Sequence, residues 1–419
     1  MKKLGFSDEA VARLTALRRD LHRNPELSWK EEKTAARLEA ELKSLGVADI
    51  RRVVGTGVVG RIPGRSKGRT VAIRGDIDAL PIEEATGLDF SSSTKGVMHA
   101  CGHDVHATWT IGAAMLLAGA PADGDVLVVL QPAEEVGEGA AAVLESGALD
   151  GAKVIIGGHV DRRYEVGQVV AQEGPLAAST DNFTIELTGQ GAHAARPHEA
   201  ADPIVGAAAL ITALQTLVSR RLDPAVPGVV TVGTVHAGTA DNIIPNRAEL
   251  TGTIRAVTRA SRDLLVEELK RISVQVAQAY RLEARVAFDT GTPPVVNHAE
   301  PAGWAREAVR AVLGENALVP LAGSNMGGED FAYYLERMPG CFLRIGAREP
   351  GGPWLPAHSP GFMVAEESIF VGAAVLAETA RRAVAVGQSG GRVVGRRLTA
   401  QSLPWARATC WAAAPAGPE

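Results

Sequence analysis

The sequence predicts an α/β fold in which a mixed, mostly parallel sheet is covered by helices and a smaller unit is inserted. Short apolar runs alternate with helical stretches over residues 1–179 and again over 292–386, which is typical of a parallel sheet. Residues 180–291 between them read βαββαβ, the order of a ferredoxin-like split-βαβ sandwich. We therefore expect a discontinuous first domain (1–179 and 292–386), an inserted domain (180–291) and a loose C-terminal tail (387–419).

Local signals along the chain predict the individual elements. Ser28 and Glu31 match a capping box, apolar residues at helical spacing follow, and Gly46 ends the run, so we predict a surface helix here. Outside the insertion, the predicted strands are Val71–Ile73, Val126–Leu130, Val154–Ile156 and Cys341–Ile345, and the predicted helices are Thr108–Leu117, Ala140–Leu144, Ala302–Leu313 and Glu366–Val386. Inside it, the predicted strands are Phe183–Leu187, Val229–Val235, Ala248–Ile254 and Glu283–Phe288, and the predicted helices are Pro203–Arg220 and Arg262–Tyr280.

The composition is that of a globular protein. With 419 residues, 46% hydrophobic and 22% charged, the chain is neither disordered nor a collagen or coiled coil. The 43 Lys and Arg residues against 48 Asp and Glu residues leave a net charge of −5, so no basic excess is available for a nucleic acid. Cys101, Cys341 and Cys410 are too few for a disulfide framework and indicate a reducing compartment. Because the N-terminus has no signal-peptide pattern and no apolar run reaches the roughly 20 residues of a membrane span, we expect a cytoplasmic protein without a membrane partner.

Residues 99–106, His-Ala-Cys-Gly-His-Asp-Val-His, place a cysteine, three histidines and an aspartate close together. A thiolate and an imidazole two residues apart in extended chain face the same side, as a metal site requires. A buried cysteine beside surface histidines has the same pattern, so Cys101 and His103 alone leave both interpretations open. Asp104 favours the metal site, because a ligating imidazole commonly donates its second N–H to a carboxylate.

Further acidic and imidazole side chains follow the predicted strands. A Glu pair in such a place is more often a solvated loop, and a lone His is more often structural, so each has little weight alone. Functional groups of open α/β sheets gather beyond the carboxyl ends of the strands, so we expect these side chains to converge. They are Asp76 and Asp78 after Val71–Ile73, Glu134 and Glu135 after Val126–Leu130, His159 after Val154–Ile156, and His358 after Cys341–Ile345.

A cysteine, three histidines and a glutamate supply S, N and O donors, enough for two divalent ions about 3.5–4 Å apart with a shared water. Glu134 would then be free to act as the base that takes the proton from this water, whose pKa the two ions lower. The resulting hydroxide attacks a carbonyl polarised by one metal, which is hydrolysis of an amide or ester. The donors leave the metal open, since Cys favours Zn whereas Glu tolerates Mn.

The inserted domain carries polar residues of its own. His193 and Asn242 suit stabilisation of an oxyanion, and Arg255 suits a forked grip on a carboxylate, although all three also fit structural turns. Elsewhere, residues 55–60 match the dinucleotide fingerprint G-x-G-x-x-G. Since Pro63 and Gly64 follow closely and no helix can begin there, we do not expect a nucleotide site.

The motifs MHACGHD, QPAEE, GHV, GAHAARPH, NIIP, GTIR, MGGEDFAYY and HSP occur in this order over residues 8–385. In them the chain resembles the aminoacylase/carboxypeptidase superfamily of metal-dependent amidohydrolases. The most similar branch is that of the hippurate hydrolases, bacterial N-acyl-amino-acid amidohydrolases and plant auxin-conjugate hydrolases. The resemblance implies a zinc-peptidase-like catalytic domain and a lid and dimerisation domain over 180–291, and thus a homodimer or higher homo-oligomer.

The resemblance also assigns roles residue by residue. The implied metal ligands are Cys101, His103, Glu135, His159 and His358, with Glu134 as general base and Asp78 as a carboxylate behind the ligands. His193 and Asn242 would contact the reacting carbonyl. Two divalent ions are implied, Mn or Zn and alternatively Co or Ni, with a small N-acyl amino acid as substrate. A dipeptidase or carboxypeptidase with the same site is the nearest alternative, and a non-catalytic metal- or ligand-binding protein is a more distant one.

This chain departs from the branch at several positions. Gly328 stands where Ser is usual, Ala357 replaces the usual Leu before His358, and Asp-Arg-Arg-Tyr-Glu-Val-Gly after His159 is atypical. Asp76 stands where related branches have a ligand histidine. These departures affect the shape of the pocket and leave the acyl-group specificity open.

Overall fold

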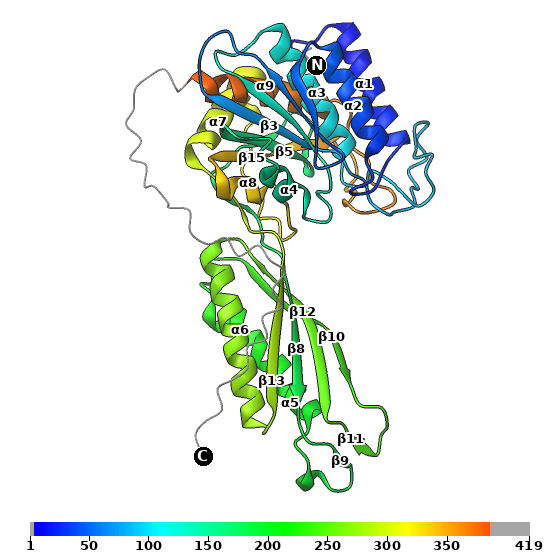
Figure 1. Ribbon diagram of the computed structural model, residues 1–419, viewed down its shortest axis with the longest axis vertical. Coiled ribbons are helices and arrows are strands. Elements are labelled where there is room, and N and C mark those ends of the chain that lie inside the picture. Colours follow the sequence, from blue (N-terminus) through cyan, green and yellow to red (C-terminus); the bar gives the residue numbers. More distant parts are fainter. Residues whose placement is uncertain (1–3, 386–419) are drawn as a thin grey trace. The chain divides into compact units, whose positions relative to one another are not determined.

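The computed structural model describes residues 4–385 (Figure 1). They form two compact units, the first comprising residues up to 176, 295–323 and from 329 onward, and the second comprising 177–294 and 324–328. The predicted C-terminal tail, 387–419, and the end of the last predicted helix at Val386 lie outside the described residues.

The first unit contains a seven-stranded sheet with the order β1-β2-β4-β3-β5-β15-β6. The central strands β4, β3, β5 and β15 run parallel, whereas β1, β2 and β6 at the edges are antiparallel to their neighbours. The bounds are β1 (Ala48–Val53), β2 (Gly57–Ile62), β3 (Thr70–Asp76), β4 (Val126–Gln131), β5 (Ala152–Glu165), β6 (Val169–Val170) and β15 (Gly340–Arg348), and β7 (Gly174–Ala177) pairs separately with β14 (Val295–Asn297). Because the central strands are buried on both faces, they read as continuous apolar runs. The predicted α/β fold with a mixed, mostly parallel sheet is confirmed.

Helices cover both faces of this sheet. In Figure 1, α3 and α9 lie on one side of the central strands, and α4 and α8 lie on the other. The helices are α1 (Asp8–Arg23), α2 (Glu32–Ser44), α3 (His103–Gly119), α4 (Gly139–Glu145), α7 (Ala299–Leu313), α8 (Ala332–Arg337) and α9 (Ser368–Ala385), with a 3₁₀ turn at Glu315–Ala317.

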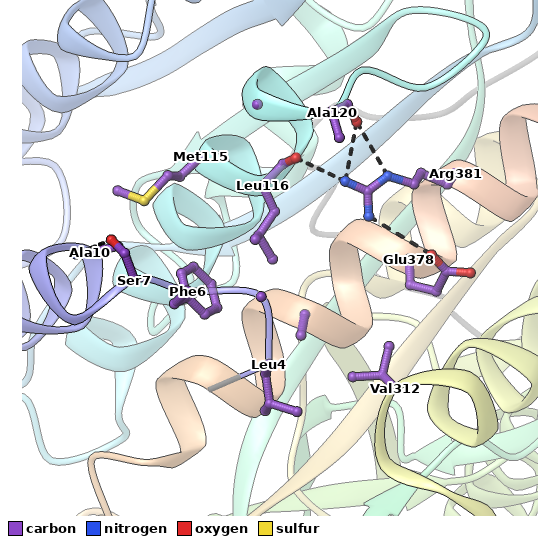
Figure 2. A pocket seen from close by; sticks show the side chains of 13 residues that line it. Leu4, Phe6, Ser7, Ala10, Met115, Leu116, Ala120, Val312, Glu378 and Arg381 are labelled. Carbon is purple, nitrogen blue, oxygen red and sulfur yellow. Dashed lines mark hydrogen bonds and ion pairs between the residues drawn. The ribbon is translucent and has the colours of Figure 1, made fainter. Parts of the chain in front are cut away.

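Helix α3 is held at its centre and at its C-terminal end. At the centre, the fully buried Trp109 packs against Gly372 of α9, where an added Cβ would lie 2.3 Å from the Trp109 ring. At the end, Arg381 of α9 donates to the carbonyls of Leu116 at 2.8 Å and Ala120 at 3.2 Å, beside a cavity of about 660 Å³ (Figure 2). The Leu116 carbonyl also accepts from the N–H of Ala120, the residue after the helix, and Arg381 adds a cationic partner to both carbonyls at this end. The first residue of α3, His103, is thereby carried on a fixed element.

The second unit is a four-stranded antiparallel sheet, with the order β10-β12-β8-β13, and two long helices. Its elements are β8 (Asp181–Thr188), β9 (Ala192–His193), a 3₁₀ turn (Pro197–Glu199), α5 (Pro203–Thr216), a π turn (Leu217–Arg221), β10 (Gly228–Ala237), β11 (Ile243–Ile244), β12 (Arg247–Ala256), α6 (Arg259–Ala279) and β13 (Glu283–Thr290). Alternate residues of β8, including Phe183, Ile185 and Leu187, are buried in this unit's own core. The strand and helix order is the βαββαβ order read from the sequence.

Two local predictions are wrong. Ser28 does not cap a helix: α2 begins at Glu32 without a side-chain cap, and the Ser28 hydroxyl instead donates to Asp78 at 2.8 Å. Glu31 is drawn into the interior, where it accepts from Thr56 and from the Ala133 N–H. Buried hydrogen-bond partners therefore take the side chains that an isolated helix would use for capping.

His159 does not follow a strand either. It lies inside β5, which continues past the predicted end at Ile156 to Glu165. The strand is longer because the neighbouring strand β15 pairs with these additional residues.

The segment Pro203–Arg221 in the second unit is long and apolar enough to cross a membrane by length and composition alone, and a third of its apolar window is buried within the structure. One such helix is weak evidence for a membrane span. Its apolar residues have a second explanation in an exposed protein face, since Ile204, Val205 and Val218 are exposed.

Candidate metal centre

The turn that begins α3 brings Cys101 and His103 together. Gly102 between them has a φ of +94°, and a Cβ there would lie 2.5 Å from Val160, so the position requires glycine. The expectation that an extended chain aligns the two ligands is wrong, because the chain turns sharply at this glycine. The two side chains nevertheless face one spot.

Five of the predicted ligands meet at this spot. The shortest distances join Cys101 Sγ to His159 Nε2 (3.3 Å), His358 Nε2 to Glu135 Oε2 (3.4 Å) and His103 Nε2 to Glu135 Oε1 (3.7 Å). Two trios, Cys101 with His103 and His159, and Cys101 with Glu135 and His358, each place their donor atoms within 4.8 Å of one another. The His103 Nε2 and Glu135 Oε1 atoms are buried with no hydrogen-bond partner in the described chain. These two unpaired ligand atoms face each other and fit a cation between them, and the whole set of ligand atoms is sufficient for two divalent ions.

Hydrogen bonds on the far nitrogen orient the imidazoles. His103 Nδ1 donates to the Asp78 carbonyl at 2.9 Å and lies 3.1 Å from the Asp78 carboxylate, and His159 Nδ1 donates to the Val160 carbonyl at 2.6 Å. A carbonyl oxygen can only accept, so in both rings Nδ1 carries the proton and Nε2 is free to bind a cation. His358 has a φ of +60°, and its backbone N–H donates to Ala100 next to Cys101.

His106 is excluded from the ligand set by the same reasoning. Its donor atoms form a further candidate trio with Asp76 and His103. However, its Nε2 accepts from the Val160 N–H at 2.9 Å and its Nδ1 pairs with Asp76 at 2.6 Å. Since both ring nitrogens are hydrogen-bonded, His106 links β3 to β5 and has no atom free for a cation.

Asp78 and Asp104 have different surroundings. Asp78 accepts from His103 and from the Glu135 N–H at 3.0 Å, so it joins two of the predicted ligands. The expectation that Asp104 serves the second nitrogen of His103 is wrong. Asp104 points towards α1, where it pairs with His22 at 2.8 Å and Arg18 at 2.9 Å, since it lies on the opposite side of the first turn of α3. Its carboxylate therefore anchors α3 to α1.

Glu134 lies next to the ligands with a distinct environment. Its Oε2 is 3.8 Å from His103 Nε2, and its Oε1 accepts weakly from the Asp330 N–H at 3.4 Å. Burial, together with the charges of Glu329, Asp330 and Glu135, raises the pKa of Glu134 well above its ordinary value. A carboxylate of raised pKa is a stronger proton acceptor, as a general base near neutral pH must be.

A buried ion network behind Glu134 was missed from the sequence. The guanidinium of Arg74 on β3 is fully buried and contacts Asp76, Asp330 (2.9 Å) and Glu329 (3.3 Å). Gln131 at the end of β4 donates to Asp330 at 2.8 Å and accepts from Arg74. The available signal was a polar residue directly after each of two apolar predicted strands, where a strand that continues by a residue or more buries that side chain and forces it to find a partner.

The polar residues of the second unit form a separate cluster. His193 on β9 and Asn242 both line a pocket of about 720 Å³, and the Ala194 N–H donates to the Asn242 carbonyl. Arg255 lies on β12 opposite Val229 and is half-buried. Within its own unit, the structure brings His193 and Asn242 together and leaves Arg255 elsewhere on the sheet.

Comparisons with known proteins identify a family of hydrolases. A profile described as peptidase family M20/M25/M40 matches residues 72–382. An N-acetyl-L-cysteine deacetylase of Bacillus subtilis is 41% identical over 88% of each chain, and an IAA-amino acid hydrolase of Arabidopsis thaliana is 36% identical over 93% of this chain and 89% of its own. The crystal structure of the Bacillus subtilis YXEP protein, titled a dinuclear metal binding peptidase from the M20 family, is 37% identical with a TM-score of 0.81 over 90% of this chain and 99% of its own.

Replacing Arg74 tests the buried network. Arg74→Met removes the guanidinium that three buried carboxylates share, so we expect the free energy of unfolding in urea to fall by about 3–5 kcal/mol at neutral pH. The loss of stability should shrink at acidic pH. Without Arg74, burial raises the folded-state pKa of these carboxyls above their unfolded value. Such groups contribute stability below the unfolded pKa, and this contribution is lost as pH rises through the folded-state pKa.

Arg65→Met is the matched control, since Arg65 is 65% exposed and pairs with Asp123 at the surface. We expect it to cost less than about 1 kcal/mol. Equal losses in the two variants would show that Arg74 does not organise the network.

Proposed function

The chain belongs to peptidase family M20/M25/M40, and from this premise we propose that it is a two-metal amidohydrolase cleaving N-acyl amino acids to a carboxylic acid and a free amino acid. The observation that carries the proposal is the convergence of Cys101, His103, Glu135, His159 and His358 on one spot beside Glu134. Family membership supports a metal-dependent hydrolase, and the names of the relatives support the substrate class.

Each residue has a proposed role. The five converging residues would hold the ions, with Asp78 holding His103 in the required tautomer. Two divalent ions bound there would lower the pKa of a water and polarise the scissile carbonyl. Glu134 takes the proton of the attacking water and later delivers it to the departing amide nitrogen. Arg74 and Asp330 keep Glu134 in place and set its surroundings.

The second unit would supply contacts to the substrate. We propose His193 and Asn242 as donors to the reacting carbonyl, and Arg255 as the partner of the amino acid's carboxylate. The soft sulfur of Cys101 and the oxygen of Glu135 suit Zn or Mn, with Co and Ni as alternatives. The paucity of cysteines supports a cytoplasmic location.

A dipeptidase or carboxypeptidase is the second candidate. A thermostable carboxypeptidase of Saccharolobus solfataricus is 37% identical over 85% of this chain. Hydrolysis rates of N-acetyl-alanine and alanyl-alanine separate the two activities.

We further propose a homodimer formed through the second unit. Strand β10 is at the edge of its sheet, and Val235 on it is 47% exposed. An edge strand with exposed apolar residues is a template for pairing with a second copy.

Metal removal tests the reaction class. Treatment with a chelator should abolish hydrolysis of N-acetyl or N-benzoyl amino acids, because the attacking water then loses its activation. Activity should return with Mn, Zn, Co or Ni, at a metal content of about two ions per chain by elemental analysis. Full metal occupancy without turnover of any N-acyl amino acid or dipeptide would contradict the proposal.

Two substitutions separate the base from the ligands. Glu134→Gln should lower kcat by about 10²–10⁴-fold while the metal content stays unchanged, because it removes a proton acceptor and no ligand. Cys101→Ala should lower the metal content itself. Glu145→Gln, an exposed Glu at the end of the next helix, is the control and should alter neither. Near-normal turnover of Glu134→Gln would refute the assigned base.

The dimer is tested by light scattering after size-exclusion chromatography. The wild type should have twice the chain mass of 43.7 kDa, and Val235→Lys should shift it towards the monomer because a charge on the edge strand opposes pairing. The control is Val296→Lys, at a valine of the first unit that is 37% exposed, and it should leave the mass unchanged. A monomeric wild type would overturn the proposed dimer.

A further inference from the structure

Arg344 on β15 lies on the face of the sheet that carries the candidate ligands. It is the register partner of His159 on the parallel neighbour β5, so the two side chains leave the sheet on the same side. Phe342, two residues earlier on this face, packs against Phe331, which directly follows Glu329 and Asp330 in the chain. The Arg344 guanidinium carbon is 5.6 Å from the centre of the Phe342 ring. Arg344 therefore lies beside the metal centre, within the first unit.

The Arg344 guanidinium is buried without a counterion. The residue is 4% exposed, its Nε has no hydrogen-bond partner, and no hydrogen bond or ion pair reaches it from anywhere in residues 4–385. Asp161 and Glu329 are the carboxylates close enough to raise its pKa against the lowering effect of burial.

Both neighbouring carboxylates are already engaged. Asp161 is held by Arg163, with contacts of 2.7 to 3.1 Å, and by the Arg163 N–H at 2.9 Å. Glu329 faces Arg74 at 3.3 Å and accepts from the Phe331 N–H at 3.1 Å. The other buried arginines of the described chain, Arg18, Arg74 and Arg162, each have acidic or carbonyl partners. Arg344 is the exception among them.

An unpaired buried guanidinium is unfavourable, and its planar fork matches the two oxygens of a carboxylate. We propose that Arg344 forms a carboxylate-binding subsite beside the metal centre and takes a carboxylate group of the substrate. The anion site stands on this geometry, and only the identification of the anion as substrate rests on the proposed function. The carboxylate has two sources, a second carboxylate on the acyl group and the α-carboxylate of the amino acid, in which case Arg344 would replace Arg255 in the proposed role.

Four substrates distinguish these sources. N-acetyl-alanine carries the α-carboxylate alone, N-succinyl-alaninamide carries the acyl carboxylate alone, N-succinyl-alanine carries both, and N-acetyl-alaninamide carries neither. Arg344→Met keeps the length of the side chain and removes the charge. We expect it to raise KM roughly 10- to 100-fold for the substrates that bear the recognised carboxylate, with kcat little changed and partial rescue in Arg344→Lys.

The control variant is Arg348→Met on the same strand, since Arg348 is paired with Glu165 at 3.3 Å and should leave KM unchanged. The pair of substrates affected by Arg344→Met identifies which carboxylate it binds. An equal loss on all four substrates, or none on any, overturns the subsite.

A binding measurement decides the matter independently of turnover. Succinate should raise the Tm of the metal-loaded wild type and of Arg348→Met, but not that of Arg344→Met. Without succinate, Arg344→Met should be no less stable than the wild type, because the substitution breaks no hydrogen bond or ion pair and removes an unpaired buried charge. A Tm increase that is the same in all three proteins, an absent increase, or a destabilised ligand-free Arg344→Met would overturn the inference. Succinate binding without hydrolysis of any substrate would instead retain the anion site and contradict the proposed function.

Discussion

The first unit depends on the need to neutralise charge inside its core. Arg74 rises from the middle of the sheet, and Asp76, Glu329 and Asp330 converge on it from β3 and the turn before α8. Gln131 adds β4 to the same network. None of these groups reaches water, so each must find its partner within the protein. This requirement ties the strand ends to α8 and creates the acidic, water-poor surroundings of Glu134.

Backbone hydrogen bonds give the clustered histidines different roles. His103, His106 and His159 are close together and chemically identical, yet they have different uses. In His103 and in His159 the Nδ1–H donates to a backbone carbonyl, which leaves Nε2 open, whereas Nε2 of His106 accepts from a backbone N–H. The backbone around each ring thus decides which imidazole can serve as a ligand.

The two arginines that follow His159 on β5 have different partners. Arg163 satisfies Asp161, and Arg162 donates to the carbonyls of Pro353 and Met363 on either side of His358. This pattern holds the His358 loop and leaves Arg344 without a carboxylate.

The alternation of apolar runs and helical periods by itself determined the α/β class and the order of elements in the insertion, and the residue types supplied the candidates for metal ligands. These features depend on local periodicity and residue type, which can be read directly from the chain. Only the tertiary structure decided which neighbours those residues meet. It turned Ser28 and Glu31 inward, gave the place beside His103 to Asp78 and not to Asp104, and buried Arg74 among carboxylates. The physical reason is that a buried polar group is satisfied by whatever lies nearest in space, and that partner is usually distant along the sequence.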